Sequence, residues 1–521
     1  MTPILPSGPA IARDPILRPL NLTLGTLGCI WFLFARLDYF WSGSSDLAFT
    51  TLLVSRRMEA FDLVSASGPS LGTLYSMPQL AFIPAAIAGA LFGSPVVGVQ
   101  IVSLLALLAV WLAGALAART VPAGIAPSFL VTAFVLAILN DASLRVELFG
   151  GEIVGNFFYA QLVGQALTMV VIAATVFLEG RGGHPHTRYI VVALAIAVLV
   201  NIHLIPAAEL LVFLLLTVFL DLRRSPPGMR LWRLGEGGLA VFGALLLIVL
   251  HPGFADAASA TFSDGTMRLR YTPEAFHVLI LALLVGALSI AALVAWLAWL
   301  DDDGRRQWAY LKALATFGLA VSACCTIQYV ALAFGYGSAQ AVKRYAFALN
   351  TTLFMALALA IAVRVTVELR RRRVGAAFFS ERSARTLACL APLTLVFSGN
   401  YQPPGQVSVS RLAEVDEFAR DYRNLVLGAE PGKEDIAIGV RGIGAVGDLL
   451  VSVDGLAAPA TGNVGAAFRR QPFPEPGSIR YLLTAPGAAP FDVPACRKYA
   501  AAIGLVVVDA QCAFAKNGPV S

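Results

Sequence analysis

The sequence carries little charge: only 13% of its 521 residues are Asp, Glu, Lys or Arg, about half the share of an ordinary soluble protein. Hydrophobic residues make up 58%. Such a surface suits a bilayer better than water, which excludes an ordinary soluble protein. The net charge of +6 comes from basic residues gathered in a few short loops, without a stripe of interleaved aromatics. That distribution argues against a nucleic-acid partner.

Several familiar motifs are also absent. The chain has no Walker loop, Rossmann glycine fingerprint or nucleophile elbow in a meaningful context, and no evident inverted repeat of the secondary-transporter kind. The six cysteines are spread thinly and none has zinc-site spacing. Four lie in apolar runs and are read as small core residues. Cys496 and Cys512 lie near the C-terminus and can pair if that region is in an oxidising compartment.

Long apolar runs dominate what is present. A membrane span needs about 20 mostly apolar residues. The first run begins near Leu20 and is too long for a signal-peptide core, so it is read as an uncleaved first span. A shorter run, 78–93, opens with Pro78. The candidate spans are 20–41, 97–118, 126–140, 157–178, 188–204, 206–222, 235–251, 275–299, 309–334, 344–364 and 384–398.

Basic loops set the orientation, because Lys and Arg favour the cytoplasmic side. The loops read as cytoplasmic carry Arg13 and Arg18, Arg181 and Arg188, Arg223 to Arg233, Arg305 to Lys312, and Arg370 to Arg373. Loops 42–77 and 141–156 then both lie outside, so an even number of spans must separate them. Three runs lie between, and 78–93, Pro-led and short, is predicted to lie in the membrane interface. The count becomes eleven spans with the C-terminus outside.

The chain therefore divides into a cytoplasmic segment, 1–19, an all-α polytopic domain, 20–398, and an extracytoplasmic domain, 399–521. Short apolar runs in the last part predict strands at 435–440, 480–484 and 504–508. Residues 412–419 and Pro494–Ile503 are predicted to be helical. The alternation indicates a small α/β domain.

The first external loop, 42–77, is far longer than neighbouring spans need, and long structured loops are usually functional. Asp46 lies near the membrane boundary, where a carboxylate can act as a general base towards a hydroxyl or amine. The alternative is that Asp46 caps a following helix, 47–60. In the second external loop Glu152 lies among glycines, where acidic residues position an acceptor or a metal, or simply face solvent.

Lys343-Arg344-Tyr345 places two cations on the outer side, against the usual bias. Two cations at the mouth of a span suit a phosphate or pyrophosphate, and the alternative is anchoring to lipid headgroups. His203 lies at the outer end of its span. Ionisable residues there are functional candidates, although a lone histidine is more often structural.

The order of these features resembles the GT-C-fold glycosyltransferases, in particular the lipid A aminoarabinose transferases and the protein O-mannosyltransferases. Asp46 with Arg56-Arg57-Met58 resembles their acidic loop start and the helix after it. Tyr75-Ser-Met-Pro78 resembles their aromatic-x-x-Pro segment, and the interfacial run 78–93 is what this fold has there. Two departures are Leu47, where many relatives have a second acidic residue, and Ser76-Met77, where many have His-Pro.

Later features continue the resemblance, which covers roughly residues 20–400. Glu152 occupies the place of the second acidic residue, and His203 that of a basic residue near the outer end of a span. Lys343-Arg344-Tyr345 resembles the late basic-x-Tyr region that contacts the lipid phosphate.

The resemblance implies transfer of a sugar from a polyprenyl-phosphate donor to an acceptor glycan, lipid or protein at the outer leaflet of a bacterial inner membrane. Lys343 and Arg344 would neutralise the leaving phosphate, and Asp46 would deprotonate the acceptor. Glu152 would assist, or hold a divalent cation if one is used. Tyr75, Arg56, Arg57, Tyr345 and His203 would contact substrate.

Two alternatives of other classes stay open. A transporter or flippase of lipid-linked saccharides predicts charges deep within several spans. A non-enzymatic membrane scaffold with an external binding domain predicts that the two external loops do not converge.

Overall fold

The computed structural model describes residues 80–372 and 481–517, each with gaps, the largest at 252–271. It also describes Ser42–Gly43, Val407–Ser408 and six single positions before residue 59. The predicted spans 20–41 and 384–398 and the predicted elements 412–419 and 435–440 lie outside these residues.

The described part of the chain is mostly helical, and eight of its helices are long and apolar enough to cross a membrane. A ninth, α9, is apolar but has only 16 residues. All nine coincide with predicted runs. They are α5 (Pro95–Ala118), α6 (Ala126–Leu139), α8 (Tyr159–Gly180), α9 (Pro185–Val200), α10 (Leu204–Arg224), α11 (Pro227–Val249), α13 (Thr272–Trp299), α15 (Ala309–Ala333) and α17 (Ala346–Arg371).

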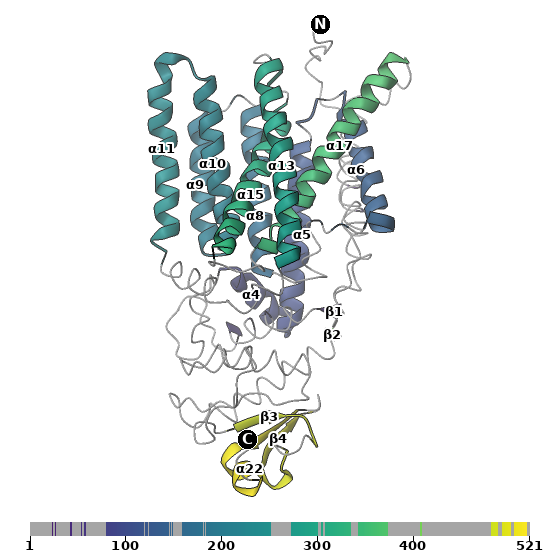
Figure 1. Cartoon of the computed structure of the whole chain (residues 1–521), viewed down its shortest axis with the longest axis vertical. Coiled ribbons are helices and arrows are strands. Elements are labelled where there is room, and N and C mark those ends of the chain that lie inside the picture. The colour runs from purple at the N-terminus through teal and green to yellow at the C-terminus, as the bar shows by residue number, and fades with distance from the viewer. Residues whose placement is uncertain are drawn as a thin grey trace.

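Helix boundaries follow simple backbone rules. Pro95, Pro185 and Pro227 each begin a helix, where the missing N–H is one that the helix leaves unpaired anyway. In hydrocarbon every backbone polar group must be satisfied internally, so apolar runs of this length form helices. The helices lie side by side as one bundle (Figure 1). One contiguous apolar core joins most of them, and a second joins α6, α15 and α17.

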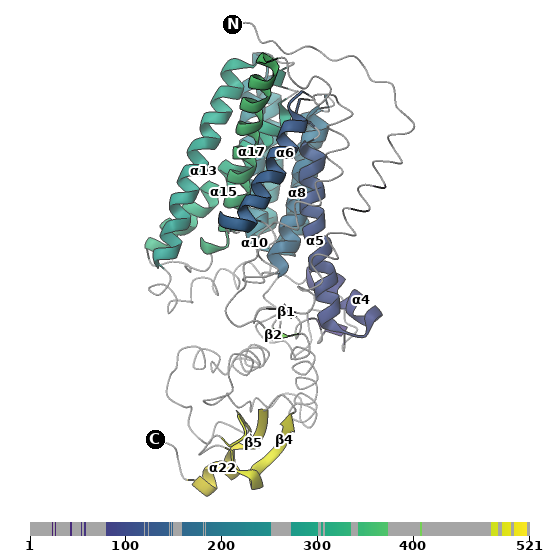
Figure 2. The same cartoon turned by 90° about the vertical axis from the view of Figure 1, so that its right-hand side faces the viewer.

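Helix α4 (Phe82–Phe92) lies at one end of this bundle (Figures 1 and 2). Its 11 residues extend about 16 Å at 1.5 Å per residue, half of what a span requires. Gly93, at φ 70°, ends it in the left-handed conformation and turns the chain into α5. Gly98 of α5 packs against α4 so closely that an added Cβ would lie 2.2 Å from the Ala85 carbonyl oxygen. The length of α4 agrees with the prediction that this run does not cross.

Buried charges fill the opposite end of the bundle. Glu179 of α8 bonds Arg188 of α9 (Nη1–Oε2, 2.5 Å) and Lys312 of α15 (Nζ–Oε2, 2.9 Å). Asp221 of α10 bonds Arg188 (Nη2–Oδ2, 2.9 Å) and Lys312 (Nζ–Oδ1, 3.2 Å). Arg224 adds a third cation, 3.3 Å from Glu179. The sequence suggested loop charges here; Arg188 and Lys312 are instead buried and tie four helices together.

The C-terminal elements lie beyond the end of the bundle at which α4 is found (Figure 1). Strands β3 (Tyr481–Thr484), β4 (Arg497–Ala501) and β5 (Leu505–Asp509) form an antiparallel sheet in the order β3-β5-β4. Helix α22 (Ala510–Asn517) follows directly. A strand was predicted at both 480–484 and 504–508, and both predictions are confirmed. The domain limits 399–521 stay a prediction.

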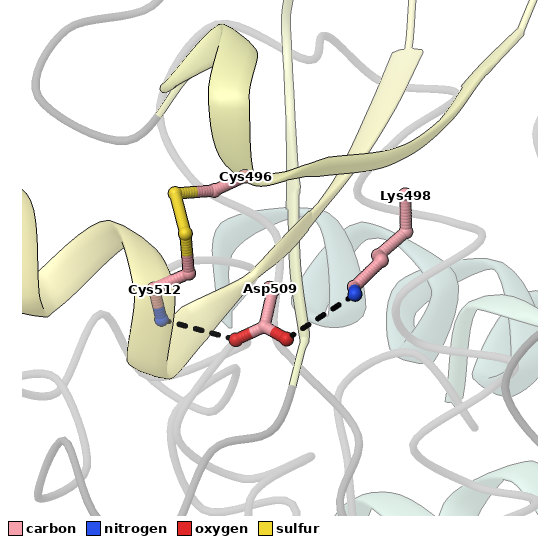
Figure 3. Close-up of a disulfide and its surroundings, with 4 residues drawn as sticks. All are labelled: Cys496, Lys498, Asp509 and Cys512. Atoms are coloured by element: carbon pink, nitrogen blue, oxygen red, sulfur yellow. Dashed lines mark hydrogen bonds and ion pairs between the residues drawn. A yellow bond between two sulfur atoms is a disulfide. The ribbon is translucent and has the colours of Figure 1, made fainter.

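The predicted helix Pro494–Ile503 is wrong. A 3-10 turn, Pro494–Cys496, leads into strand β4, which pairs with β5. The alanine-rich segment favours a helix locally, but pairing beside the buried Val506–Val508 overrides that preference. A disulfide joins Cys496 to Cys512 of α22, and Asp509 accepts from the Cys512 N–H (Figure 3).

Candidate functional site

The entry to α4 is fastened to the ends of α8 and α9. The Leu80 N–H donates to the Asn201 carbonyl (2.8 Å), just after α9. The Tyr159 hydroxyl, at the start of α8, donates to the Ala81 carbonyl (2.7 Å), and its ring stacks on Phe82 at 5.7 Å. These contacts bring α4 next to the residues that precede α10 and to the start of α8. We call this region the α4 end of the bundle.

His203 and Arg344 meet at the α4 end. His203 caps α10, and its Nδ1 accepts from the Ile205 N–H at 3.2 Å. With Nδ1 as acceptor, the proton of a neutral ring is on Nε2, and Nε2 lies 3.4 Å from Arg344 Nη1. Both groups are then donors, so the pair is arranged for an acceptor that bridges them. Burial, helped by the Arg344 charge, lowers the pKa of His203, which favours the neutral ring.

The segment that carries Arg344 is held by its backbone and its neighbours. The Gln161 side chain of α8 donates to the Arg344 carbonyl at 3.0 Å. Tyr345 begins α17 and is 3% exposed, so it anchors the segment in the core. Lys343 is partly exposed and lies 3.6 Å from Glu274, at the start of α13. The arrangement presents cationic and neutral donors at the end of the apolar bundle, as an anion site requires.

The structure thus brings together four of the residues predicted from sequence: His203, Lys343, Arg344 and Tyr345. A fifth, Arg57, is buried. Its neighbour Met58 packs against Gly89 of α4, where an added Cβ would lie 2.7 Å from the Met58 sulfur. The remaining predicted residues lie outside the described part of the chain. These are Asp46, Arg56, Tyr75 and Glu152.

Sequence reasoning missed four residues that build this end of the bundle. Tyr159 fastens α4 and Gln161 holds the Arg344 segment. The Asn201 side chain lies 3.1 Å from His251 Nε2, and burial lowers the pKa of His251. One signal was available for the glutamine: Gln161, Gln165 and Thr168 share one face of an otherwise apolar run at helical spacing.

Metal binding was left open from the sequence. Among the described residues, no three His, Cys, Asp or Glu side chains gather where they could hold a metal ion. Glu152, the carboxylate that could hold a divalent cation, is not in that part of the chain.

No protein-family model matches the sequence, and no curated protein matches it. Among solved structures, the chain is similar to the crystal structure of ArnT from Cupriavidus metallidurans bound to undecaprenyl phosphate. The alignment covers 95% of this chain and 97% of that one, at 14% sequence identity and a TM-score of 0.39. A TM-score this low supports no inference, so the function proposed below rests on this chain's own residues.

Proposed function

We propose that the chain is an integral membrane glycosyltransferase that moves a sugar from a polyprenyl-phosphate donor to an acceptor at the outer leaflet of a bacterial inner membrane. The observation that carries the proposal is the His203–Arg344 pair, whose Nε2 and Nη1 atoms lie 3.4 Å apart at one end of an apolar bundle. The sequence resemblance of the long first loop and of Lys343-Arg344-Tyr345 supports the same reading.

A polyprenyl phosphate matches this end of the bundle in two ways. Its hydrocarbon tail partitions into the bilayer beside the apolar helices, which leaves the phosphate at the boundary. There Arg344 and the neutral His203 donate to phosphate oxygens, and Lys343 adds a second positive charge. A free sugar nucleotide would gain nothing from the apolar surroundings.

The same donors favour reaction over binding alone. In the transfer, the bond between the sugar C1 and the phosphate oxygen breaks, and a bond from C1 to the acceptor oxygen or nitrogen forms. The donor phosphodiester carries one negative charge and the departing polyprenyl phosphate approaches two. Fixed donors aimed at the phosphate therefore bind the transition state more tightly than the ground state.

The acceptor must lose a proton when its nucleophile attacks. In our proposal Asp46 accepts this proton, and Glu152 assists it or holds a divalent cation. Arg56, Arg57 and Tyr75, from the same loop as Asp46, contact the substrate. Tyr345 positions its neighbour Arg344 from within the core.

Binding of undecaprenyl phosphate to the purified full chain tests the phosphate site. Arg344→Gln removes one charge-assisted contact, so we expect affinity to fall about 10- to 150-fold. Arg344→Lys keeps the charge but loses the planar fork, and we expect an intermediate loss. The matched control is Arg372→Gln, because the Arg372 side chain is 70% exposed and pairs with Glu368.

Unchanged affinity in both Arg344 variants would refute the phosphate site. Supplying a polyprenyl-phosphate sugar with candidate acceptors then separates transfer from transport. A donor that crosses the bilayer with its sugar still attached favours the transporter alternative.

A further inference from the structure

One face of α8 is polar although it lies deep within the bundle. Gln161, Gln165 and Thr168 recur at helical spacing, and each is at most 1% exposed. Glu209, on the second turn of α10, is 0% exposed and faces this strip. Nothing in the proposed transfer reaction uses Glu209.

The contact between the two helices is a single short hydrogen bond. Gln165 Nε2 donates to Glu209 Oε2 at 2.6 Å. The other oxygens of the two groups, Gln165 Oε1 and Glu209 Oε1, are both buried and have no partner among the described residues. Two buried acceptors without a partner are costly, since an unpaired buried polar group loses its hydration without compensation.

An ionised Glu209 would be costlier still. No Lys, Arg or His in the described part of the chain forms an ion pair with it. Within electrostatic range are the thiols of Cys324 and Cys325 from α15 and the phenol of Tyr345. None of these supplies positive charge, and a lone buried carboxylate loses several kcal/mol of hydration.

The charges on the helices packed against α10 do not compensate it. Glu179 of α8, Arg188 of α9 and Lys312 of α15 belong to the network at the opposite end, with Asp221. Asp221 is twelve positions further along α10 than Glu209, or about 18 Å along the axis. On α11, Arg233 pairs with Glu236.

One proton on Glu209 would remove its charge and give both Gln165 Oε1 and Glu209 Oε1 a hydrogen-bond partner. A carboxylic acid and a primary amide are complementary, because each has one donor and one acceptor on the same edge. We propose that Glu209 is a proton-binding site inside the bundle, where the neutral carboxyl and Gln165 form a pair with two antiparallel hydrogen bonds. Gln165 Nε2–H donates to Glu209 Oε2, as observed, and Glu209 Oε1–H donates to Gln165 Oε1. Both unsatisfied oxygens then have a partner.

A bound metal cation is the competing occupant, since Gln161 Oε1 and Thr168 Oγ1 are further buried oxygens without a partner among the described residues. The observed hydrogen bond disfavours it. Gln165 turns its N–H towards the carboxyl group, and an amide N–H repels a cation that an amide oxygen would attract.

A neutral Glu209 also bears on the α4 end. Gln161 lies one turn before Gln165 on α8 and bonds the Arg344 carbonyl. The acid–amide pair therefore fixes the helix face from which the Arg344 segment is held, and it adds no negative charge beneath the two donors. This inference does not depend on what the α4 end binds.

Infrared spectroscopy of the full chain in lipid nanodiscs tests the proton directly. We expect a carbonyl band of a protonated carboxyl at neutral pH that is lost in Glu209→Gln. Glu236→Gln is the matched control, because Glu236 pairs with Arg233 and Trp232, away from α8. We expect the control to keep the band.

Two further measurements guard against a variant that does not fold. Glutamate labelled with carbon-13 at the side-chain carboxyl must shift the band in the unmodified protein. The melting temperature in sodium salt must equal that in choline salt. The proposal would be overturned if the labelled protein showed no shifted band of a protonated carboxyl. It would also be overturned if sodium stabilised the protein and Glu209→Gln abolished that stabilisation. Neither result would bear on whether the chain is a glycosyltransferase.

Discussion

Replacing Asp221 tests whether charge balance stabilises the buried network at the end of the bundle opposite α4. Three cations, Arg188, Arg224 and Lys312, share two carboxylates, Glu179 and Asp221. Asp221→Asn leaves three cations facing Glu179 alone, and it removes one of the two charged acceptors of Arg188 and of Lys312. Breaking a buried pair from one side in this way destabilises a protein by about 3–5 kcal/mol.

Lys312→Met is the informative comparison, because it removes just as many ion pairs but restores neutrality. Glu179 keeps Arg188 and Arg224, and Asp221 keeps Arg188 and the Tyr189 hydroxyl at 3.0 Å. Met fills most of the Lys312 volume, so we expect a loss of only about 1–3 kcal/mol, from the missing charge-assisted bonds. The predicted order is therefore Asp221→Asn well below Lys312→Met, with the unmodified chain most stable.

The assay is thermal unfolding of the purified full chain in one detergent at one scan rate, since large membrane proteins unfold irreversibly and only the ranking is meaningful. Arg372→Met, at a mostly exposed ion pair on α17, is the control and should change little. If Lys312→Met were as destabilising as Asp221→Asn, hydrogen bonding rather than charge balance would hold the network.

Three further outcomes are expected. Asp46→Asn abolishes sugar transfer but leaves the melting temperature unchanged; full activity in that variant would remove Asp46 as the base. The hydrogen bond from Arg497 holds the pKa of Asp492 below its usual range. The ionised Asp492 carboxylate therefore stabilises the fold at pH values above the ordinary carboxyl pKa. This stabilisation is lost as the pH falls towards the lowered pKa. Protection of the β4 amides against hydrogen exchange, measured relative to the intrinsic exchange rate at each pH, should fall on acidification. Asp492→Asn should remove that acid dependence and leave protection in α15 unaffected. Thiol labelling of the non-reduced chain should find Cys496 and Cys512 blocked, and two reactive thiols there would rule out the disulfide.

Hydropathy and charge parity predicted much of the helical architecture, because both follow from the cost of leaving polar groups in hydrocarbon. Parity required that one of three runs not cross, and short length and the leading Pro78 singled out the run that forms α4. The same reasoning could not find the network at Asp221, since partners such as Glu179 and Lys312 lie 133 positions apart and meet only through helix packing. Pro494–Ile503 was misread because alanine favours helices locally, whereas β4 forms by pairing with a strand that follows it.

The candidate site, too, was predictable from the sequence only in part. Lys343-Arg344 was visible as an external basic pair, and His203 as an ionisable residue at a span end. Their approach to each other depends on how α10 and α17 begin, and the cap at His203 fixes its ring. Gln161 and Glu209 are visible in the sequence as polar residues in apolar runs. Their partners depend on helix packing and become known only when the opposite helix face is known.

The short pairing of β1 (Ser42–Gly43) with β2 (Val407–Ser408) has a consequence for how the chain is made. Gly43 pairs with Val407, 364 positions later, so the first strand waits for nearly the whole membrane domain to be synthesised. At about 5–20 residues per second this delay is roughly 20–70 s. During that time the helices between the two strands can insert and pack, and the strand pair closes over an already assembled bundle. Truncation before residue 407 removes this late pairing together with the C-terminal sheet, and it should leave the helices between the two strands in place.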